Sequence, residues 1–586
     1  MIPNWNFSKK FTLRDLKVGL NNLKPGKAAG ADKIFPEFLI NCGLRTKKWL
    51  VNMFSRIVHS SVMPPIFKKS TVIAILKPGK DGNDPEDFRP ISLLCVTYKL
   101  LERLVLERIQ SKVNSVLPVE QAGFRTDRGC NEQMLAFSSF VETGFQHHQK
   151  TFIVQLDLTA AYDTVWKDAL LLKFIKVIPC ARLFRLLSNM LSNRMFQIHF
   201  GNHRSRWRTL NNGLPQGSVL APLLFNLYTH DLPKTISQKF VYADDITLAY
   251  QCKSFEEAEA VLQKDLATMA QFFKSWRLKL NLSKTEVSAF HLNNQMANRQ
   301  LNIQLNNAIL RHNSNPKILG IIFDRSLSFR VHLERKSQKL SSRINLLQQL
   351  AGTSWGANAN TLGTATLSLV FSSAEYCCSV WLQSAHCYKI DVQLNRAMRI
   401  VSGTIKTTPL PWLPVLSNIL PPDLRRKQAL VNTIQKNTSL NNSLLSQFVS
   451  QTVPQVLSRK PPCTLATELI NDGFDAVKTW INMWTSINLE NSNLILDPSV
   501  KVPGFDFNRD RWCKLNRIRT DHGRCHRTLH QWGVLDDPSC DCGFAIQDIH
   551  HIVAECPLRR FSGSLFDINI GNDPANIWLD NLDIKL

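Results

Sequence analysis

Two acidic sites at the ends of apolar, β-branched segments constrain the fold of this chain more than any other feature. Residues 152–158 (FIVQLDL) predict a buried strand that ends at Asp157. Residues 239–249 (KFVYADDITLA) predict a strand, a tight turn and a second strand, and the turn carries Asp244 and Asp245. We therefore expect a sheet that presents three carboxylates at the ends of its strands.

Carboxylates placed in this way are costly unless something neutralises them. Adjacent negative charges repel each other, and burial adds a desolvation penalty. A divalent cation offsets both effects, and Mg²⁺ prefers hard oxygen ligands. Two such ions about 3.5–4 Å apart can activate an attacking 3′-hydroxyl and stabilise a leaving pyrophosphate. Taken singly, each aspartate is more often a turn or N-cap residue, so the neighbouring motifs must decide between the two interpretations.

The composition of the chain favours a nucleic-acid partner. The 586 residues exceed one compact domain and suggest about three or four. Lys and Arg number 71 against 46 Asp and Glu, so the net charge is +25. Such an excess favours a polyanion, either nucleic acid or an anionic membrane. Because the sequence has no apolar run of about 18 residues and no secretory signal at its start, we expect no membrane partner.

Other segments have the periodicity of regular elements. Residues 70–76 (STVIAIL) predict a short strand. An amphipathic helix is predicted where apolar residues recur at helical spacing, at Ala258, Val261, Leu262, Leu266, Met269 and Phe273. The 14 cysteines are mostly scattered singly, which is typical of a chain that keeps its thiols reduced.

Two basic segments lie in the second half of the chain. The helix predicted at about 331–350 carries Lys336, Lys339 and Arg343 three and four residues apart. Residues 515–533 (LNRIRTDHGRCHRTLHQWG) mix basic residues with histidines and a tryptophan. Both segments fit either a solvated surface or a contact with single-stranded nucleic acid, and the sequence leaves both alternatives open.

The motifs around the three aspartates resemble those of the reverse transcriptases of non-LTR (LINE-like) retrotransposons, and most closely the jockey-like elements of animals. YADD is similar to the polymerase signature of that family, and LDLTAAYDTVW to the motif that carries its first metal-binding aspartate. Six further segments are similar and follow the family's order: LKPGKAAGADKI (23–34), LKPGKDGNDPEDFRPISLL (76–94), QAGFR (121–125), GLPQGSVLAPLLFNLYTHDLP (213–233), LKLNLSKTEVSAF (278–290) and PKILGIIFD (316–324). The resemblance covers about residues 15–405 and 505–586.

The resemblance implies an α+β fold of the right-hand polymerase type, with fingers, palm and thumb. It also implies a helical connector and a small C-terminal Cys/His unit that resembles zinc-binding modules. The expected domains are the N-terminal extension of the polymerase (1–57), the fingers and palm (58–328), a helical thumb (329–420), the connector (421–504) and the C-terminal nucleic-acid-binding unit (505–586).

The resemblance also assigns catalytic roles. Asp157 and Asp244 would be the two direct metal ligands, and we expect them to lie within metal-bridging distance. Asp245 would be a third, less directly coordinated carboxylate. Lys284 matches the lysine proposed as general acid for the leaving pyrophosphate, a position that suits a cation electrostatically. Two Mg²⁺ ions are therefore the expected cofactors.

Further residues match the nucleotide pocket of the family. Tyr162 would be the aromatic steric gate that excludes ribonucleotides, a role compatible with its being a core aromatic. Gln216 would line the pocket, and the backbone at Gly217 can approach a nucleotide closely because glycine has no Cβ. Lys77 and Arg89 could neutralise triphosphate or template phosphates, and the guanidinium fork suits that role best.

Three details of these motifs carry weaker expectations. Asp163 is expected to be a structural cap, and Arg125 either a template contact or a structural one. Residues 159–161 read Thr-Ala-Ala where many relatives have a basic residue or a serine. Because none of the three carboxylates is lost, this departure gives no indication of a dead enzyme.

A cysteine–histidine cluster lies near the C-terminus. Cys540, Cys542, His551 and Cys556 have the spacing C-x-C, eight residues, H-x4-C. Four such ligands can close a tetrahedral Zn²⁺ site, although one residue between the first pair is tighter than usual. The spacing alone leaves zinc binding and separately buried thiols equally open. The resemblance favours a structural Zn²⁺, and it favours His551 over the adjacent His550.

The function expected from the resemblance is RNA-directed DNA polymerisation, with element RNA as template, a DNA 3′-hydroxyl as primer and dNTPs as substrates, in the nucleus after a cytoplasmic RNA-bound stage. The rivals are another polymerase, such as an intron maturase or an RNA-dependent RNA polymerase, and an inactive or domesticated RNA-binding remnant. The chain starts almost at the polymerase's own extension, so no endonuclease is expected within it, and residues 420–510 have no evident ribonuclease H carboxylates.

Overall fold

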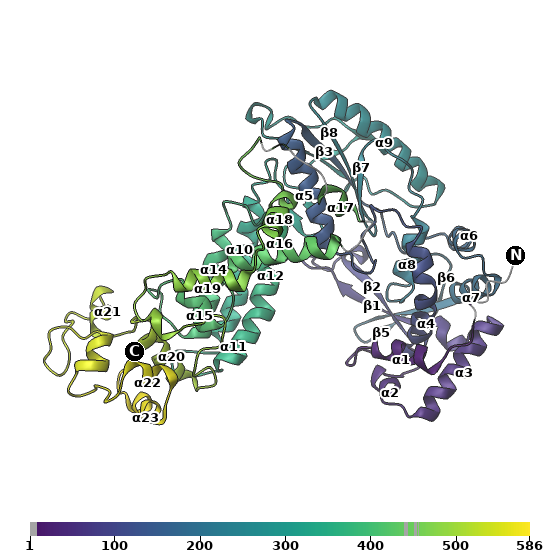
Figure 1. Ribbon diagram of the computed structural model, residues 1–586. Coiled ribbons are helices and arrows are strands. Elements are labelled where there is room, and N and C mark those ends of the chain that lie inside the picture. Colours follow the sequence, from purple (N-terminus) through teal and green to yellow (C-terminus); the bar gives the residue numbers. More distant parts are fainter. Residues whose placement is uncertain (1–6, 8, 439–442, 450–453, 455) are drawn as a thin grey trace. The chain divides into compact units, whose positions relative to one another are not determined.

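The computed structural model describes residues 7, 9–438, 443–449, 454 and 456–586 as a mixture of helices and strands (Figure 1). The chain divides into two compact units, and each is built from several chain segments. The first comprises residues 1–133, 149–289 and 293–313, and the second comprises 134–148, 290–292 and 314–586. None of the helices in the described part is both long and apolar enough to cross a membrane.

The first unit contains a five-stranded sheet with the strand order β12-β9-β3-β8-β7. Its strands are β3 (Lys150–Leu156), β7 (Gln238–Tyr242), β8 (Asp245–Cys252), β9 (Glu286–Phe290) and β12 (Arg311–His312). β8 pairs antiparallel with both β7 and β3, and Leu156 lies opposite Ile246. The predicted strands are thus confirmed, and this register brings the end of β3 opposite the start of β8.

Helix α9 (Phe255–Ser275) packs on this sheet, as Figure 1 shows. Ser254 caps its N-terminus, where the hydroxyl accepts a hydrogen bond from the backbone N–H of Glu257 at 3.3 Å. The apolar positions predicted from the sequence form the buried face, except that Val261 is only half-buried. The Phe255 ring meets Phe152 of β3 edge to face at 4.8 Å. Burial of each such side chain stabilises the fold by about 1.5–3 kcal/mol.

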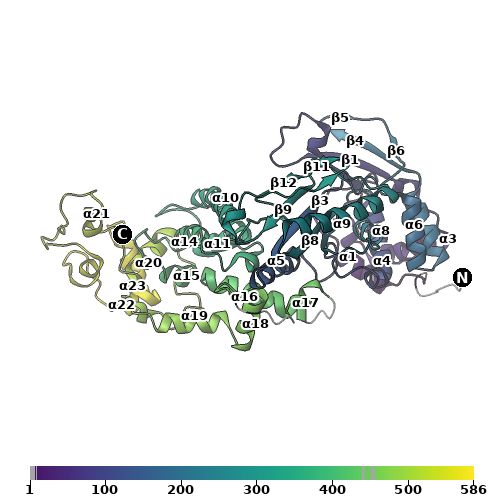
Figure 2. The ribbon, with the colours of Figure 1, turned by 90° about the horizontal axis from the view of Figure 1, so that it is seen from above.

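A second sheet in the first unit has the order β2-β1-β4-β5, with β6 also paired to β4 (Figure 2). Its strands are β1 (Lys69–Leu76), β2 (Phe88–Leu94), β4 (Arg194–Phe200), β5 (His203–Arg204) and β6 (Arg208–Leu210). β1 confirms the strand predicted at 70–76. It pairs antiparallel with β2, with Ser70 opposite Leu94 at one end and Leu76 opposite Phe88 at the other. The two strands therefore form a hairpin that holds the loop between them at its end.

Helices cover both sheets of the first unit and share one hydrophobic core with them. They are α1 (Leu13–Asn21), α2 (Pro36–Ile40), α3 (Leu44–Ser60), α4 (Val96–Asn114), α6 (Lys167–Val177), α7 (Ala181–Leu191) and α8 (Ala221–Tyr228). α4 is buried on most sides, and Leu100 and Leu101 are fully inaccessible to solvent. Short elements complete the unit: 3-10 turns at Pro65–Lys68, Pro85–Asp87 and Asn294–Met296, and the strands β10 (Gln304–Leu305) and β11 (Ala308–Ile309).

The second unit is almost entirely helical. Its helices are α5 (Cys130–Gln146, whose first turn lies in the first unit), α10 (Arg330–Gln348), α11 (Ala359–Thr366), α12 (Ser372–Ala374), α13 (Cys378–Trp381), α14 (Tyr388–Ser402), α15 (Trp412–Ser417), α16 (Pro422–Thr438), α17 (Leu444–Val449), α18 (Pro462–Asn471), α19 (Ala476–Thr485), α20 (Arg509–Arg519), α21 (His526–Gln531), α22 (Leu565–Ile570) and α23 (Asp573–Asn581). π-helical turns span Leu367–Phe371 and His551–Glu555, a 3-10 turn spans Ser492–Leu494, and β13 (Lys317–Ile318) pairs with β14 (Ile321–Ile322).

The basic segment predicted at 515–533 begins inside α20, which is buried against the C-terminal end of α14. Side chains of α20 donate hydrogen bonds to the last carbonyl groups around that end: Arg509 to Ile400 (2.7 Å) and Val401 (3.1 Å), Trp512 to Val401 (2.9 Å), Asn516 to Ser402 (2.8 Å) and Arg517 to Gly403 (3.0 Å). Arg519 is also buried, and it donates to Asn569. Arg509 and Arg517 thus satisfy carbonyl groups at the end of α14. Neither interpretation left open for this segment, a solvated surface or a nucleic-acid contact, describes the buried Arg517 and Arg519.

The basic stripe predicted on α10 is also partly engaged within the second unit. Lys336 is half-buried against aromatic rings, and its ammonium group donates to the carbonyl of Tyr376 at 3.2 Å. Arg343 donates to the carbonyl of Leu369 at 2.5 Å, whereas Lys339 is exposed. The three cations therefore do not form a uniformly solvated stripe, because two of them donate hydrogen bonds to backbone carbonyls.

Candidate active site and metal-binding cluster

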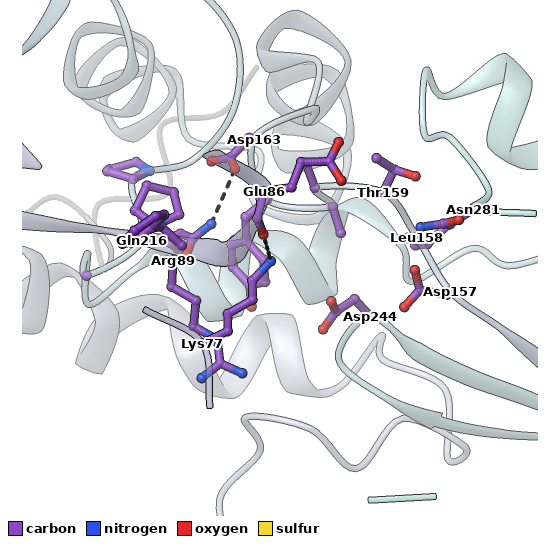
Figure 3. Close-up of a pocket in the computed structure, with 18 of the residues that line it drawn as sticks. Lys77, Glu86, Arg89, Asp157, Leu158, Thr159, Asp163, Gln216, Asp244 and Asn281 are labelled. Carbon is purple, nitrogen blue, oxygen red and sulfur yellow. Dashed lines mark hydrogen bonds between the residues drawn. The ribbon is translucent and has the colours of Figure 1, made fainter. Parts of the chain in front are cut away.

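A pocket of about 810 Å³ in the first unit gathers the residues predicted to bind metal and nucleotide, with the exception of Asp245 (Figure 3). They are Lys77, Arg89, Asp157, Tyr162, Gln216, Gly217, Asp244 and Lys284. These residues come from the two sheets, the loop before α8 and the segment before β9. Residues up to 207 positions apart in the sequence, Lys77 and Lys284, therefore face one cavity.

Asp157 and Asp244 lie near each other in this pocket (Figure 3). Asp157 follows the end of β3, and Asp244 occupies the turn that joins β7 to β8. Partial burial raises the pKa of Asp157, although the positive charge of Lys284 and the amide of Asn281 oppose the increase. Burial also raises the pKa of Asp244, and the negative charge of Asp157 adds to that increase. The two carboxylates therefore share one field and repel each other.

Asp245 is the first residue of β8 and keeps an exposed surface. The protein around its carboxylate and the charges of Asp244 and Asp157 raise the pKa of Asp245 to about 6. Among the described residues, the three aspartates do not come together within 4.8 Å of one another as a set of metal ligands. Asp245 is accordingly coupled to the pair electrostatically while its side chain does not line the pocket.

The segment that carries Lys284 is held by the backbone of the first aspartate. The N–H of Asn281 donates to the carbonyl of Asp157 at 2.8 Å, and the N–H of Lys284 donates to the carbonyl of Asn281 at 3.3 Å. Lys284 is exposed at the pocket, and its charge acts on the Asp157 carboxylate. Asn281 also lines the pocket, and the sequence interpretation did not assign it a role. Its position three residues before Lys284 was the available signal.

Tyr162 presents a rigid ring to the pocket. The ring stacks on Phe225 of α8, with centroids 4.7 Å apart and planes inclined by 16°. Its hydroxyl is buried and has no hydrogen-bond partner among the described residues. Burial raises the pKa of Tyr162, with a further contribution from Asp244. The side chain is thus a neutral, fixed wall, and the predicted core role and the predicted pocket position coincide.

The loop that carries Gln216 and Gly217 packs tightly on its neighbours. The carbonyl of Gln216 accepts a hydrogen bond from the N–H of Ser92 at 2.7 Å. Gly217 has a φ of +131°, and a Cβ there would lie 2.5 Å from the Ser92 carbonyl oxygen. Gly213 has a φ of +82°, and a Cβ there would lie 2.6 Å from the Asp163 carbonyl oxygen. Both glycines are therefore required by close contacts within the chain itself.

The same loop is anchored at its far end by a buried carboxylate that the sequence interpretation missed. Glu102 of α4 accepts hydrogen bonds from the hydroxyl of Ser218 (2.5 Å) and the N–H of Val219 (2.9 Å). Burial raises the pKa of Glu102, and these two donors oppose the increase. Little in the sequence marks this residue, because the same helix carries Lys99, Arg103 and Glu107. Glu102 therefore anchors the loop that joins β6 to α8.

Asp163 does not cap a helix as expected. No described helix begins at this residue, since α6 starts at Lys167. The Asp163 carboxylate accepts a hydrogen bond from the side-chain amide of Gln216 at 3.3 Å (Figure 3). The contact links the segment after β3 to the Gln216 loop, and both residues line the pocket.

Lys77 and Arg89 come from the ends of β1 and β2. The ammonium group of Lys77 donates to the carbonyl of Glu86 at 2.6 Å (Figure 3), and its charge reaches Asp157. Arg89 is exposed, and no residue in the described ranges makes a hydrogen bond or ion pair with its guanidinium. The hairpin thus presents one partly engaged cation and one free cation to the pocket.

Arg125 serves the fold, which resolves one of the open alternatives. Its guanidinium donates to the carbonyls of Pro118 (2.8 Å), Gln121 (3.2 Å) and Asn114 (3.3 Å). Burial lowers the pKa of Arg125 to about 10. The side chain therefore stabilises the loop that follows α4.

In the second unit, Cys540, Cys542, His551 and Cys556 form a compact cluster whose ligand atoms all lie within 4.8 Å of one another. The Sγ atoms of Cys540 and Cys556 are 3.9 Å apart, and Cys542 Sγ is 3.2 Å from His551 Nε2. Zinc ligands at about 2.3 Å in a tetrahedron are about 3.8 Å from one another. The donor set and its dimensions therefore fit a closed four-ligand site.

The surroundings of the cluster select one of the two adjacent histidines. His551 is buried, directs Nε2 to the cysteines and places Nδ1 3.3 Å from Glu555. His550 is exposed and is not part of the cluster. Burial tends to raise the pKa of Cys540, but hydrogen bonds from the Cys542 backbone and the Gln547 amide lower it to about 6. Cys540 thus favours the thiolate form that metals require, whereas the neighbouring Cys540 and Cys556 raise the pKa of Cys542.

Comparison with known proteins gives one family match. Residues 75–323 match the family described as reverse transcriptase (RNA-dependent DNA polymerase). This segment contains every pocket residue discussed above.

Curated relatives extend the similarity along the chain. The chain is 30% identical over 415 residues to the probable RNA-directed DNA polymerase from transposon BS of Drosophila melanogaster, which covers 67% of this chain and 45% of the relative. It is 29% identical over 414 residues to the RNA-directed DNA polymerase from mobile element jockey of Drosophila funebris, with 68% and 44% covered. The match to the probable enzyme from transposon X-element of Drosophila melanogaster is 26% over 454 residues, with 75% and 49% covered. The chain spans about half the length of these relatives.

Proposed function

The chain belongs to the reverse transcriptases of non-LTR retrotransposons, and from this premise we propose that it copies RNA into DNA from the 3′-hydroxyl of a DNA primer. The observation that carries the proposal is the gathering of Asp157, Asp244, Lys284 and Arg89 around one cavity. Two acidic and two basic groups in one pocket suit a reaction that transfers a charged phosphoryl group between oxygen atoms.

Asp157 and Asp244 would hold the metal ions, with Asp245 in support. The fit rests on their hard oxygen donors and on burial, which raises the pKa of all three carboxyls. Neighbouring aspartates add to the increase at Asp244 and Asp245. When bound, two Mg²⁺ ions would supply an activated primer hydroxyl and a stabilised pyrophosphate. A divalent cation would therefore offset both the burial of these charges and the repulsion among them.

The other pocket residues would bind and orient the nucleotide. Arg89 has a guanidinium without a protein partner in the described ranges, so its fork is free to bind triphosphate oxygens. Lys77 adds positive charge from the same hairpin. Tyr162 would exclude a ribose 2′-hydroxyl, because its stacking on Phe225 keeps the ring from moving aside. Lys284 would deliver a proton to the leaving pyrophosphate.

On the basis of the proposed polymerase function, we also assign the parts of a right-hand polymerase to segments of the chain. The sheet that contains β3 and β8 would be the palm, and the sheet that contains β1 and β2 the fingers. Residues 329–420 would be the thumb, residues 421–504 a connector and residues 505–586 a nucleic-acid-binding unit. The N-terminal extension would be residues 1–57. The Cys/His cluster would hold one structural Zn²⁺, as its donor set and dimensions support.

The partners follow from the proposed reaction and from the net charge of +25. They are an RNA template, a DNA primer at the target site and dNTPs. Such a reaction on chromosomal DNA would take place in the nucleus, after the protein has bound its RNA in the cytoplasm.

The test is DNA synthesis on poly(rA)–oligo(dT) with Mg²⁺. We expect incorporation of dTTP by the wild-type protein, little use of UTP, and no synthesis by the variant Asp244→Asn. RNA binding should survive in that variant, because the substitution keeps the shape of the side chain. Asp168→Asn, an exposed position in the first turn of α6, is the matched control and should stay active. Synthesis that persists in Asp244→Asn would refute the mechanism, and an inactive wild type that binds RNA would favour the remnant.

A further inference from the structure

The segment before Phe124 runs alongside the turn that carries Asp244. Residues 120–122 pair with the end of β7: the N–H of Ala122 donates to the carbonyl of Val241 at 2.9 Å, and the N–H of Val241 donates to the carbonyl of Glu120 at 3.1 Å. Gln121 forms a parallel bridge with Val241. This short pairing places the Gln121 side chain beside the next residues of the hairpin.

The Gln121 amide holds the backbone of Ala243 from both sides. Its Oε1 atom accepts hydrogen bonds from the N–H groups of Ala243 (2.9 Å) and Gly123 (2.8 Å), and its Nε2 group donates to the carbonyl of Ala243 at 3.4 Å. Both Gln121 and Ala243 are buried. One amide therefore satisfies the donor and the acceptor of a single residue in the catalytic turn.

Ala243 needs such support because its backbone is left-handed. Its φ is +59°, a conformation that L-residues other than glycine adopt at a cost. Ala243 directly precedes Asp244, so a change in its φ would swing the aspartate side chain relative to Asp157. Strained residues of this kind persist only where the surrounding structure determines them, and here the determining group is the Gln121 amide.

The Gln121 segment is itself anchored from the opposite side. The carbonyl of Gly123 accepts a hydrogen bond from the side-chain amide of Asn226 in α8 at 2.8 Å. A Cβ at Gly123 would lie 2.4 Å from the Ala243 nitrogen, so glycine is needed for the segment to approach the turn. Helix α8, residues 120–123 and the turn between β7 and β8 are thus joined through buried hydrogen bonds.

We propose that Gln121 is a positioning residue for the metal site, which sets the place of the Asp244 carboxylate through the backbone of Ala243. The inference rests on the proposed function for the meaning of the site, and it adds a residue that contacts neither substrate nor metal. Arg125 in the same motif acts on backbone groups near Gln121 instead, because its guanidinium donates to the carbonyls of Asn114, Pro118 and Gln121.

The principal variant is Gln121→Met, which keeps the length of the side chain and removes both kinds of hydrogen bond. We expect kcat on poly(rA)–oligo(dT) to fall about ten- to a hundredfold, with a rise in the Mg²⁺ concentration for half-maximal activity. Mn²⁺ binding to the protein without nucleic acid, measured by electron paramagnetic resonance, should weaken by a similar factor. This second readout does not require polymerase activity.

Gln146→Met is the matched control. Gln146 is also buried, and its Oε1 atom also accepts two backbone N–H groups, those of Val456 and Leu457. It lies in the second unit and does not line the pocket. Its replacement should lower the melting temperature about as much as Gln121→Met while leaving kcat and Mn²⁺ affinity unchanged. Equal losses of Mn²⁺ affinity in both variants would overturn the proposal.

A second substitution tests the route through Ala243. Glycine enters the left-handed region freely, so Ala243→Gly in the Gln121→Met background should recover part of the Mn²⁺ affinity and of kcat. No recovery would show that Gln121 does not act through this backbone. If Gln121→Met fails to fold, Gln121→Asn replaces it, because its shorter amide remains polar but cannot reach both N–H groups.

The outcomes separate this inference from the proposed function. In one outcome, the wild-type protein synthesises no DNA, but Gln121→Met still binds Mn²⁺ more weakly than the wild type does. This result would support the positioning role and count against the polymerase. In the other outcome, the wild-type protein is active, and Gln121→Met has the same Mn²⁺ affinity and Mg²⁺ dependence as the wild type. This result would refute the positioning role and leave the proposed polymerase function unchanged.

Discussion

The two candidate metal sites of this protein are built in opposite ways. The four ligands of the Cys/His cluster come from 17 consecutive residues, and their ligand atoms already lie within 4.8 Å of one another. The acidic residues of the pocket come from two strand ends 87 residues apart, and they line a cavity of about 810 Å³ with several cations. The first site is closed, whereas the second leaves room for other molecules.

The difference matches what each site has to do. A structural metal site supplies all ligands from the protein, while a catalytic site leaves coordination positions for water and substrate. In the pocket, burial raises the pKa values of Asp157 and Asp244, and Lys284 and Asn281 oppose the increase at Asp157. In the cluster, hydrogen bonds to Cys540 stabilise the thiolate in advance. On the proposed function, a metal would add stability at the cluster and reactivity in the pocket.

The largest effect on activity is expected in the pocket, where substitutions can distinguish a direct metal ligand from a supporting carboxylate. Asp157→Asn should lower kcat by about a thousandfold or more, because a directly bound ligand is lost. Asp245→Asn should cost only about tenfold, as expected for a supporting residue. Steady-state kinetics with dTTP measure both. Equal losses would mean that Asp245 is as direct a ligand as Asp157.

Removal of a cluster ligand should change stability and leave the pocket's chemistry alone. Cys556→Ser should release zinc and destabilise the C-terminal part of the chain by several kcal/mol, since structural zinc contributes directly to folding. Metal analysis and thermal unfolding of the full chain provide the measurement. The control is Cys463→Ser, a buried cysteine of the same unit outside the cluster. A full complement of zinc in the Cys556 variant would contradict the assignment.

A buried carboxylate outside both sites, paired with an arginine, offers a third point of comparison. Glu142 of α5 is buried and lies 2.9 Å from Arg459, and burial raises the pKa of Glu142 to about 7 although Arg459 opposes the increase. A raised folded-state pKa stabilises the protein below the unfolded value, and this contribution disappears as the pH rises through about 7.

The Glu142 contribution to the free energy of unfolding should therefore fall by about 2 kcal/mol between pH 5 and pH 7. Glu142→Gln should remove that pH dependence, which urea unfolding at the two pH values would detect. A wild type and variant with parallel pH profiles would show that Glu142 keeps an ordinary pKa. Mg²⁺ should not alter the profile of Glu142, in contrast to that of the pocket aspartates.

The smallest effect concerns the second contact of the zinc histidine. Glu555→Gln should weaken zinc binding about tenfold, because Glu555 orients His551 through Nδ1. Competition with a chromophoric chelator gives the affinity. His550→Ala serves as the comparison, since His550 is exposed and outside the cluster. A larger loss in the His550 variant would reverse the choice between the two histidines.

Local sequence patterns predicted much of the local structure. The strands β1, β3, β7 and β8 could be predicted because short runs of apolar and β-branched residues favour strands wherever they occur. The apolar face of α9 followed from helical spacing for the same reason. The acidic residues could be identified as candidates because charged groups at the ends of apolar strands need a compensating partner.

Other features could not be derived from local patterns. The sequence left open whether the cations of α20 and α10 face solvent or nucleic acid. Arg509 and Arg517 of α20 instead bind the carbonyl groups at the end of α14, a helix more than 100 residues earlier, and Lys336 of α10 packs on aromatic rings. A cation in the sequence does not reveal whether a carbonyl, a ring or water will face it, because that depends on which elements pack together.

The sequence by itself determined which residues can do chemistry: three aspartates at strand ends, a pocket motif rich in glycine, and four zinc-type ligands within a short segment. Only the tertiary structure decided how they act together. The register of β3 on β8 brings Asp157 to Asp244, the amide of Gln121 supports the left-handed Ala243, and burial selects His551 over His550. The physical reason is that strand and helix preferences are local, whereas burial, register and hydrogen-bond partners arise only when distant segments pack against each other.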